Sequence, residues 1–167
     1  MLRIYRCLKE LDFPPLMQIY IEGNQEKATA YGGGLQRPEQ EFYDYLRDVF
    51  FRQPGAFYAV WEESGVQVSA LRLEPYADGL LLEALETAPP YRGKGYAKAL
   101  ILAVLSRLED VTVYSHVEKS NIASLRTHFS CGFTVMADYA RYLDGTVTQK
   151  AYTLHICCKE TGKRRSG

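Results

Sequence analysis

One segment in the middle of the chain combines residue types that bind phosphate groups. Residues 89–98, PPYRGKGYAK, contain three cations and two glycines and no acidic residue. Glycine lets the backbone approach a ligand closely. Unpaired N–H groups at a helix N-terminus attract anions. We therefore predict that this segment binds a diphosphate or another multiply phosphorylated ligand. The cations are Arg92, Lys94 and Lys98, and the glycines are Gly93 and Gly95.

A helix begins directly after this segment. From Ala97 to Leu108, apolar residues recur at the helical period, which predicts an amphipathic helix. Cations at a helix N-terminus oppose the helix dipole unless an anion compensates them, so an incidental surface turn is the weaker interpretation. Two other phosphate motifs are absent. The segment has no GxxxxGK[ST] pattern, and a GxGxxG pattern fails at Lys98.

A carboxylate interrupts the apolar strand that precedes the segment. Glu83 lies within the run Leu80–Leu85, and we expect partial burial to raise its pKa toward the range of a general base. Glu86 is the alternative, and either side chain could instead face solvent. A carboxylate of this kind could act as a general base, directly or through water.

The periodicity along the chain predicts a mixed α/β sheet with helices on both faces. The expected order is β-α-α-β-β-β-α-β-α-β-β, with one β-α-β crossover in the middle. Residues 22–38, rich in glycine, are expected to form a loop. The expected strands are residues 2–8, 56–61, 66–73, 80–87, 111–117, 133–139 and 147–158, and the expected helices are residues 16–20, 42–51, 97–108 and 121–131.

Two motifs resemble those of the GNAT superfamily of N-acetyltransferases. Arg92-x-x-Gly95-x-Ala97, preceded by Pro89-Pro90-Tyr91, is similar to the family's acetyl-CoA loop, [RQ]-x-x-G-x-[GA]. The second motif, Asn121-Ile122-Ala123-Ser124 followed by Cys131-Gly132-Phe133, resembles the family's N-x-x-[AS]…GF helix. The expected element order matches the GNAT acyl-CoA N-acyltransferase fold over residues 1–158, which leaves residues 159–167 as a basic, flexible tail.

The resemblance implies that this chain transfers an acetyl group from acetyl-CoA to a primary amine by direct attack in a ternary complex. Glu83 matches a position where several relatives carry a catalytic glutamate. Some relatives use only water as the base. A binding module that senses acyl-CoA without turnover is the alternative, and no metal is expected. The implied cofactor residues are Leu85, Thr87, Arg92, Gly93, Lys94, Gly95, Tyr96, Ala97, Lys98, Asn121 and Ser124.

Within these implied roles, the main chain of residues 93–98 would hold the diphosphate of coenzyme A. Thr87 would form sheet-like hydrogen bonds with the pantetheine arm. Asn121 would contact pantetheine, cap its helix, or do both.

A histidine stands where most GNAT relatives carry a tyrosine that protonates the leaving thiolate. His128 follows Asn121 by seven residues, and an imidazole can deliver a proton at neutral pH. The alternative is a histidine without a catalytic role, with Tyr139 or Tyr142 as the acid.

The resemblance also places the acceptor amine between the first two helices and the late hairpin. Aromatic rings and carboxylates there would suit a small cationic amine, although aromatic residues on helices are more often part of the core. Polyamine, aminoglycoside, amino acid and peptide acceptors all stay open, and so does a homodimer. The residues concerned are Tyr31, Phe42, Tyr43, Tyr58, Trp61, Glu22 and Glu26.

Composition excludes several other classes of protein. The chain has 167 residues, 20 basic and 20 acidic, so no global positive charge suggests nucleic acid or an anionic membrane as a partner. The longest apolar run, residues 99–105, is far shorter than the ~20 residues of a membrane-spanning helix. The start, MLRIYRCLKELDF, lacks the apolar core of a signal peptide. We expect a cytoplasmic protein whose four cysteines are reduced thiols.

Overall fold

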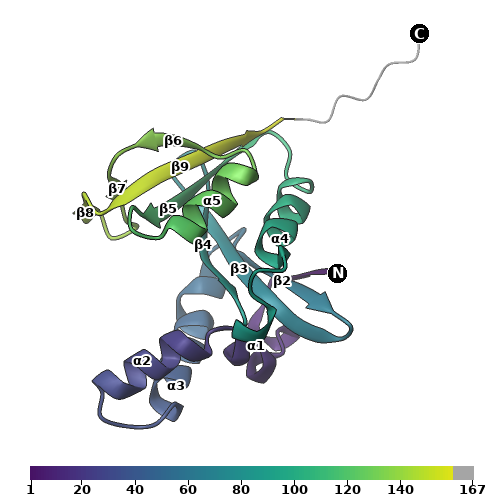
Figure 1. The fold of residues 1–167 in the computed structure, drawn as a ribbon, viewed down its shortest axis with the longest axis vertical. Coiled ribbons are helices and arrows are strands. Elements are labelled where there is room, and N and C mark those ends of the chain that lie inside the picture. The colour runs from purple at the N-terminus through teal and green to yellow at the C-terminus, as the bar shows by residue number, and fades with distance from the viewer. Residues whose placement is uncertain (160–167) are drawn as a thin grey trace.

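A mixed sheet of seven strands, in the order β1-β2-β3-β4-β5-β9-β6, organises the chain (Figure 1). The computed structural model describes residues 1–159. Residues 160–167, which make up nearly all of the predicted tail, lie outside the described residues. The strands are β1 (Leu2–Tyr5), β2 (Phe57–Glu63), β3 (Val66–Tyr76), β4 (Gly79–Thr87), β5 (Val111–Glu118), β6 (Thr134–Ala137) and β9 (Ala151–Cys158), with β7 (Ala140–Arg141) and β8 (Val147–Thr148) as a separate pair.

Helices cover both faces of this sheet, as predicted. Three helices precede β2, one lies between β4 and β5, and one between β5 and β6. The α-helices are α1 (Phe13–Ile19), α2 (Ile21–Ala30), α3 (Gln36–Asp48), α4 (Tyr96–Leu105) and α5 (Ile122–Ser130), and short 3-10 helices are formed by Leu8–Glu10, Phe50–Arg52 and Pro89–Tyr91.

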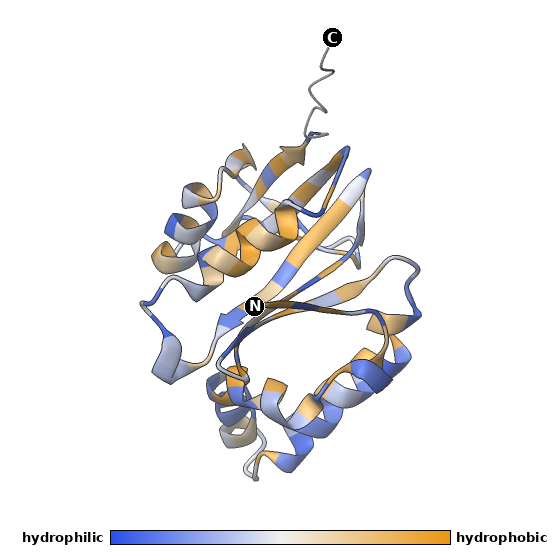
Figure 2. Ribbon diagram, turned by 90° about the vertical axis from the view of Figure 1, so that its right-hand side faces the viewer, coloured by the Kyte–Doolittle hydropathy of each residue, from blue (hydrophilic) through white to orange (hydrophobic). Residues whose placement is uncertain are grey.

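Two hydrophobic cores hold the layers together. One lies between the sheet and α4 and α5, and contains Leu82 and Leu100. The other lies between the sheet and α1 and α3, and contains Leu46 and Tyr58. Hydrophobic residues concentrate along the central strands and on a helix that packs against them, whereas the lower helices are mostly hydrophilic (Figure 2). The α1 and α3 layer therefore depends on a few large apolar side chains.

The sheet forks at its centre. β4 pairs in parallel with β5, which confirms the predicted crossover, but the pairing covers only Leu80–Leu82 against Val113–Ser115. Directly beyond it, β4 has an irregular register against β3, and Ala84 adopts a left-handed conformation with φ 51°. Such a bulge bends a strand. The last residues of β4 therefore turn away from β5 and keep one backbone edge free of sheet pairing.

Two predictions about local structure are wrong. Residues 21–30 form α2 rather than a loop, and α3 begins at Gln36, within the expected loop. The late hairpin contains the additional short strands β7 and β8. The glycines of residues 22–38 suggested a loop, but Gly23 lies within α2, which tolerates the cost of about 1 kcal/mol that a glycine carries relative to alanine.

The start of β4 depends on a close backbone approach. A Cβ added at Gly79 would lie 2.0 Å from the carbonyl oxygen of Thr112, at the edge of β5. We expect Gly79→Ala to lower the free energy of unfolding by about 1–3 kcal/mol, because overpacking forces the backbone to move. Urea denaturation measures this change. Gly34→Ala is the control, since nothing lies within 4 Å of that position, and an equal loss in both variants would contradict the prediction.

Candidate active site

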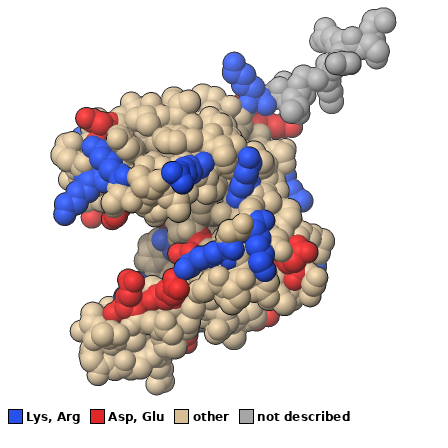
Figure 3. Space-filling model, viewed as in Figure 1, with Lys and Arg blue, Asp and Glu red and all other residues tan. Residues whose placement is uncertain are grey.

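A groove with a volume of about 430 Å³ lies where β4 ends and where α4 and α5 begin. It opens into a cleft between the lobe of α2 and α3 and the lobe that carries α5 (Figure 3). Of the residues predicted to bind the cofactor, all except Lys94 line this groove. The lining residues from that set are Leu85, Thr87, Arg92, Gly93, Gly95, Tyr96, Ala97, Lys98, Asn121 and Ser124.

The first turn of α4 has the geometry of an anion-binding helix N-terminus. Gly95 is its N-cap residue with φ 82°, and no side chain caps the helix. The N–H groups of the first turn of a helix have no acceptor within that helix. Gly93 also has a positive φ, and no atom lies within 4 Å of a Cβ built at either glycine. The backbone is therefore open toward the groove where a phosphate would lie.

Arg92 lines the groove, but its guanidinium is already paired with two carboxylates. Its guanidinium forms ion pairs with Glu22 of α2, at 2.7 Å, and with Glu86 of β4, at 3.1 Å. Lys94 lies over the ring of Tyr91, with 5.3 Å between its Nζ and the ring centroid. Among the three predicted cations, Lys98 is the one that lines the groove without a carboxylate partner in the described structure.

Thr87 occupies the free edge of β4, where sheet-like bonds with pantetheine are expected. Its N–H donates to Oε1 of Glu86 at 3.1 Å, and its carbonyl accepts from Nε of Arg92 at 3.0 Å. Its hydroxyl lies 2.9 Å from the hydroxyl of Ser69. A ligand that bonds to the main chain of Thr87 would therefore replace Glu86 and Arg92 as partners.

The start of α5 forms the opposite wall of the groove. Oδ1 of Asn121 accepts the N–H of Ser124 at 3.1 Å, which confirms the predicted helix cap. Ala123 and Thr127 also line the groove, and sequence reasoning missed both. They are four residues apart and therefore share a helix face. This spacing is the sequence feature from which their common position at the groove could have been predicted.

His128 lies inside the core, outside the set of residues that line the groove. Its side chain is 2% exposed. Its Nδ1 lies 2.8 Å from the carbonyl oxygen of Ser124, which can only accept, so Nδ1 carries the proton. Nε2 then accepts from the hydroxyl of Ser115 at 3.0 Å. Burial lowers the pKa of His128, against the opposing effect of the Ser124 carbonyl, so its imidazole is neutral at pH 7.

Glu83 belongs to a group of charged side chains on the α1 and α3 side of the sheet. Its Oε1 accepts from Nε of Arg72 at 2.7 Å, and this ion pair is largely buried. Glu74 is completely buried beside it and accepts a hydrogen bond from Gln53. Burial, the hydrogen bond with Glu83 and the negative charge of Glu83 raise the pKa of Glu74. In its protonated form, Glu74 donates this hydrogen bond to the Glu83 carboxylate.

The expected rise in the pKa of Glu83 is wrong. Burial raises it, but the hydrogen bond from Glu74 and the charge of Arg72 outweigh burial and lower the pKa below its usual range. Glu83 is therefore a carboxylate at neutral pH. A lowered pKa makes it a weaker proton acceptor and a good counter-charge for a cation.

The aromatic residues expected around the acceptor do not form one wall. Tyr58 is fully buried, and its hydroxyl donates to Tyr20, which in turn donates to the carbonyl of Ala84 at the bulge. Trp61 packs with the core on the other face of the sheet. Side chains three apart on a strand point to opposite faces, so Tyr58 and Trp61 cannot line the same site.

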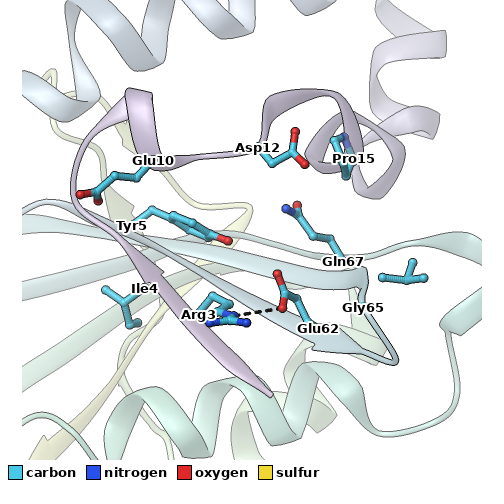
Figure 4. A pocket seen from close by; sticks show the side chains of 10 residues that line it. Arg3, Ile4, Tyr5, Glu10, Asp12, Pro15, Glu62, Gly65 and Gln67 are labelled. Atoms are coloured by element: carbon cyan, nitrogen blue, oxygen red, sulfur yellow. Dashed lines mark hydrogen bonds and ion pairs between the residues drawn. The ribbon is translucent and has the colours of Figure 1, made fainter.

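A larger cavity lies elsewhere, between β1, the β2–β3 turn and α1, with a volume of about 830 Å³ (Figure 4). Its lining contains none of the predicted site residues. Arg3 forms an ion pair there with Glu62 at 3.0 Å, and Gln67 is buried in its wall. The groove at α4 is smaller, but it combines a free helix N-terminus, a free strand edge and a neighbouring carboxylate cluster.

Among residues 1–159, no helix has both the length and the apolar character needed to cross a membrane.

Comparison with known proteins agrees with the geometry of the groove. No curated protein matches the chain. Residues 16–133 match the family model described as the Acetyltransferase (GNAT) family.

Solved structures with low sequence identity share the fold. The ribosomal-protein-S18-alanine N-acetyltransferase from Escherichia coli is 20% identical, with 98% of each chain covered and a TM-score of 0.60. The PaiA N-acetyltransferase from Thermoplasma acidophilum, in complex with coenzyme A, is 13% identical, with 94% of this chain and 99% of that chain covered and a TM-score of 0.62. A mutant of the spermidine N-acetyltransferase SpeG from Vibrio cholerae is 15% identical, with 94% of each chain covered and a TM-score of 0.57. The chain belongs to the GNAT family of acetyltransferases.

Proposed function

We propose that this protein transfers an acetyl group from acetyl-CoA to a primary amine by direct attack in a ternary complex. The observation that carries the proposal is the groove at the start of α4, where a free helix N-terminus faces the free edge of β4. A diphosphate fits the first, and the amide groups of a pantetheine arm fit the second.

In this proposal, the main chain of residues 93–98 binds the diphosphate, and Lys98 adds a positive charge. Leu85 and Thr87 hydrogen-bond to pantetheine, while Asn121 and Ser124 border the arm from α5. These residues hold the thioester toward the fork between β4 and β5. Most of the rate acceleration then comes from holding amine and thioester in attack geometry.

Glu83 is the carboxylate nearest the fork along β4, and it acts on the acceptor's ammonium group, directly or through water. His128 as the acid for the leaving thiolate stays a prediction, and its buried, neutral imidazole does not favour it. The second proton of the attacking nitrogen can reach the thiolate when the tetrahedral intermediate collapses. A cytoplasmic location and a homodimer also stay predictions.

A thiol-release assay tests the proposal. Purified protein is mixed with acetyl-CoA and, separately, with polyamines, aminoglycosides, amino acids and peptides with a free N-terminus. We expect at least one class to release coenzyme A thiol well above the background without acceptor, with an equal amount of acetylated product. Tight coenzyme A binding without turnover on any amine would contradict the enzyme and favour an acyl-CoA-sensing module.

A further inference from the structure

Two titratable side chains meet at the fork of the sheet. The parallel pairing of β4 with β5 ends at Leu82 and Ser115. The next residue on each strand is Glu83 on β4 and His116 on β5, so the two occupy the first unpaired positions, opposite each other. The sequence could not reveal this, because Glu83 and His116 are brought together only by the register.

Glu83 and His116 also face the same side of the sheet. Side chains alternate along a strand. Leu82 packs into the α4 and α5 core, so Glu83 points to the opposite side, where it meets Arg72. Val117 packs into that same core and Ser115 contacts His128 of α5, so His116 also points away from α4 and α5.

The imidazole of His116 is held in a fixed orientation. The ring of Tyr76 from β3 lies edge-on to it, with 5.2 Å between centroids. The ring of Tyr142, which follows β7, does the same at 5.6 Å. These tyrosines, Glu83 and His155 of β9 are the titratable groups that face His116 from the neighbouring elements, since His155 pairs with Tyr114, the next side chain on the same face of β5. A fixed ring aims its nitrogens in defined directions.

One nitrogen of this ring lacks a partner. Nε2 of His116 is buried and forms no hydrogen bond within the described residues. A buried polar atom without a partner costs free energy, and such atoms are often explained by function. Burial also lowers the pKa of His116, although the Glu83 carboxylate opposes the shift, so the neutral form predominates at pH 7. A neutral imidazole with a free nitrogen can accept a proton.

We propose that His116 is a catalytic residue whose Nε2 accepts the proton released by the acceptor's ammonium group, while the Glu83 carboxylate stabilises the resulting imidazolium. The assignment rests on the proposed function and names the group that takes the proton. It gives Glu83 the part of a counter-charge rather than of the base expected from the sequence.

In the proposed acetyl transfer, each proton and electron pair has a defined destination. The ammonium loses one proton to His116, and the free amine forms an N–C bond with the acetyl carbon. The C–S bond breaks, and its electron pair stays on sulfur. The second proton on nitrogen passes to the thiolate, which gives the amide and coenzyme A thiol. His116 then releases its proton to solvent.

The test compares His116→Gln with His155→Gln, a histidine of β9 to which the proposal gives no role. With the best acceptor from the amine panel, we expect His116→Gln to lower kcat/KM by roughly 10²-fold at neutral pH. His155→Gln should stay close to wild type, and coenzyme A affinity and the thermal unfolding midpoint should change little in both. Imidazole in the buffer should partly restore the activity of His116→Ala, which tests the role in a second variant.

The pH profile distinguishes proton transfer by His116 from a purely structural role. In the wild type, kcat/KM should fall at low pH as His116 becomes protonated. In His116→Gln this limb should disappear, and the rate should follow only the fraction of free amine. In Glu83→Gln, NMR titration of the His116 ring should show a lower pKa than in the wild type, because the favourable carboxylate is gone.

Several outcomes would overturn the assignment. Activity of His116→Gln within twofold of wild type, or an unchanged acid limb, contradicts it while the proposed function stands. Absence of turnover in the wild-type protein with every amine contradicts the proposed function, and this assignment with it.

Discussion

Replacing Ala97 with glutamate is expected to weaken coenzyme A binding by at least about 100-fold, which equals roughly 2.8 kcal/mol. Ala97 lines the groove in the first turn of α4. A carboxylate at this position would compete for the backbone N–H groups and repel the diphosphate. The same charge suits a helix N-terminus and stabilises helices there by about 0.3–1 kcal/mol. Calorimetry should therefore show lost binding, with thermal unfolding unchanged or slightly raised.

Two variants separate the local charge from size and overall charge. Ala97→Gln adds similar volume without charge, so we expect it to lose clearly less affinity than Ala97→Glu. Leu102→Glu adds the same charge to an exposed position farther along α4 and should bind coenzyme A normally. Equal affinity of Ala97→Glu and the wild type would show that the ligand's phosphates lie elsewhere.

Glu83→Gln is expected to lower kcat/KM by roughly 10²-fold, within the range of positioned proton transfer. The side-chain amide of glutamine has no negative charge, so it cannot stabilise a cation at the fork as the Glu83 carboxylate does. Coenzyme A affinity should stay within about twofold of wild type, because Glu83 does not line the groove. Steady-state thiol release together with calorimetry distinguishes these two effects.

The fold should survive this change. Arg72 loses one partner, but removal of the Glu83 charge lowers the pKa of the adjacent Glu74, which can then ionise beside Arg72. Glu62→Gln is the matched control, since Glu62 also pairs with an arginine on the sheet (Figure 4) but does not line the groove. If both variants keep full activity, Glu83 has no part in the reaction.

The cofactor groove could be predicted from the sequence because most of it is local. Residues 87–98 are contiguous, and a strand end, two glycines and a helix start place most of them around one space. The cap formed by Asn121 is local as well. Helix α2 could not be predicted in this way, because contacts outside the helix contribute to its formation. Asn24 and Gly23 disfavour helix by themselves, but Asn24 is buried, with its amide 3.6 Å from the sulfur of Met17.

The chemistry at the fork could not be predicted from the sequence. The lowered pKa of Glu83 depends on Arg72 and Glu74, which reach it through strand register and a bulge. His116 faces Glu83 only because the parallel pairing ends one residue earlier. His128 matched a family position but lies in the core, where Ser115 and Ser124 hold it. Spacing along one helix does not determine whether a side chain reaches the groove.

The most direct measurement is calorimetry of the wild-type protein with coenzyme A and, separately, with pantetheine, which lacks the diphosphate and the phosphorylated adenosine. A diphosphate bound by the main chain of α4 predicts saturable binding of one coenzyme A per chain, with pantetheine at least about 100-fold weaker. Absence of coenzyme A binding, or equal affinity for the two compounds, would contradict the groove assignment and every role derived from it.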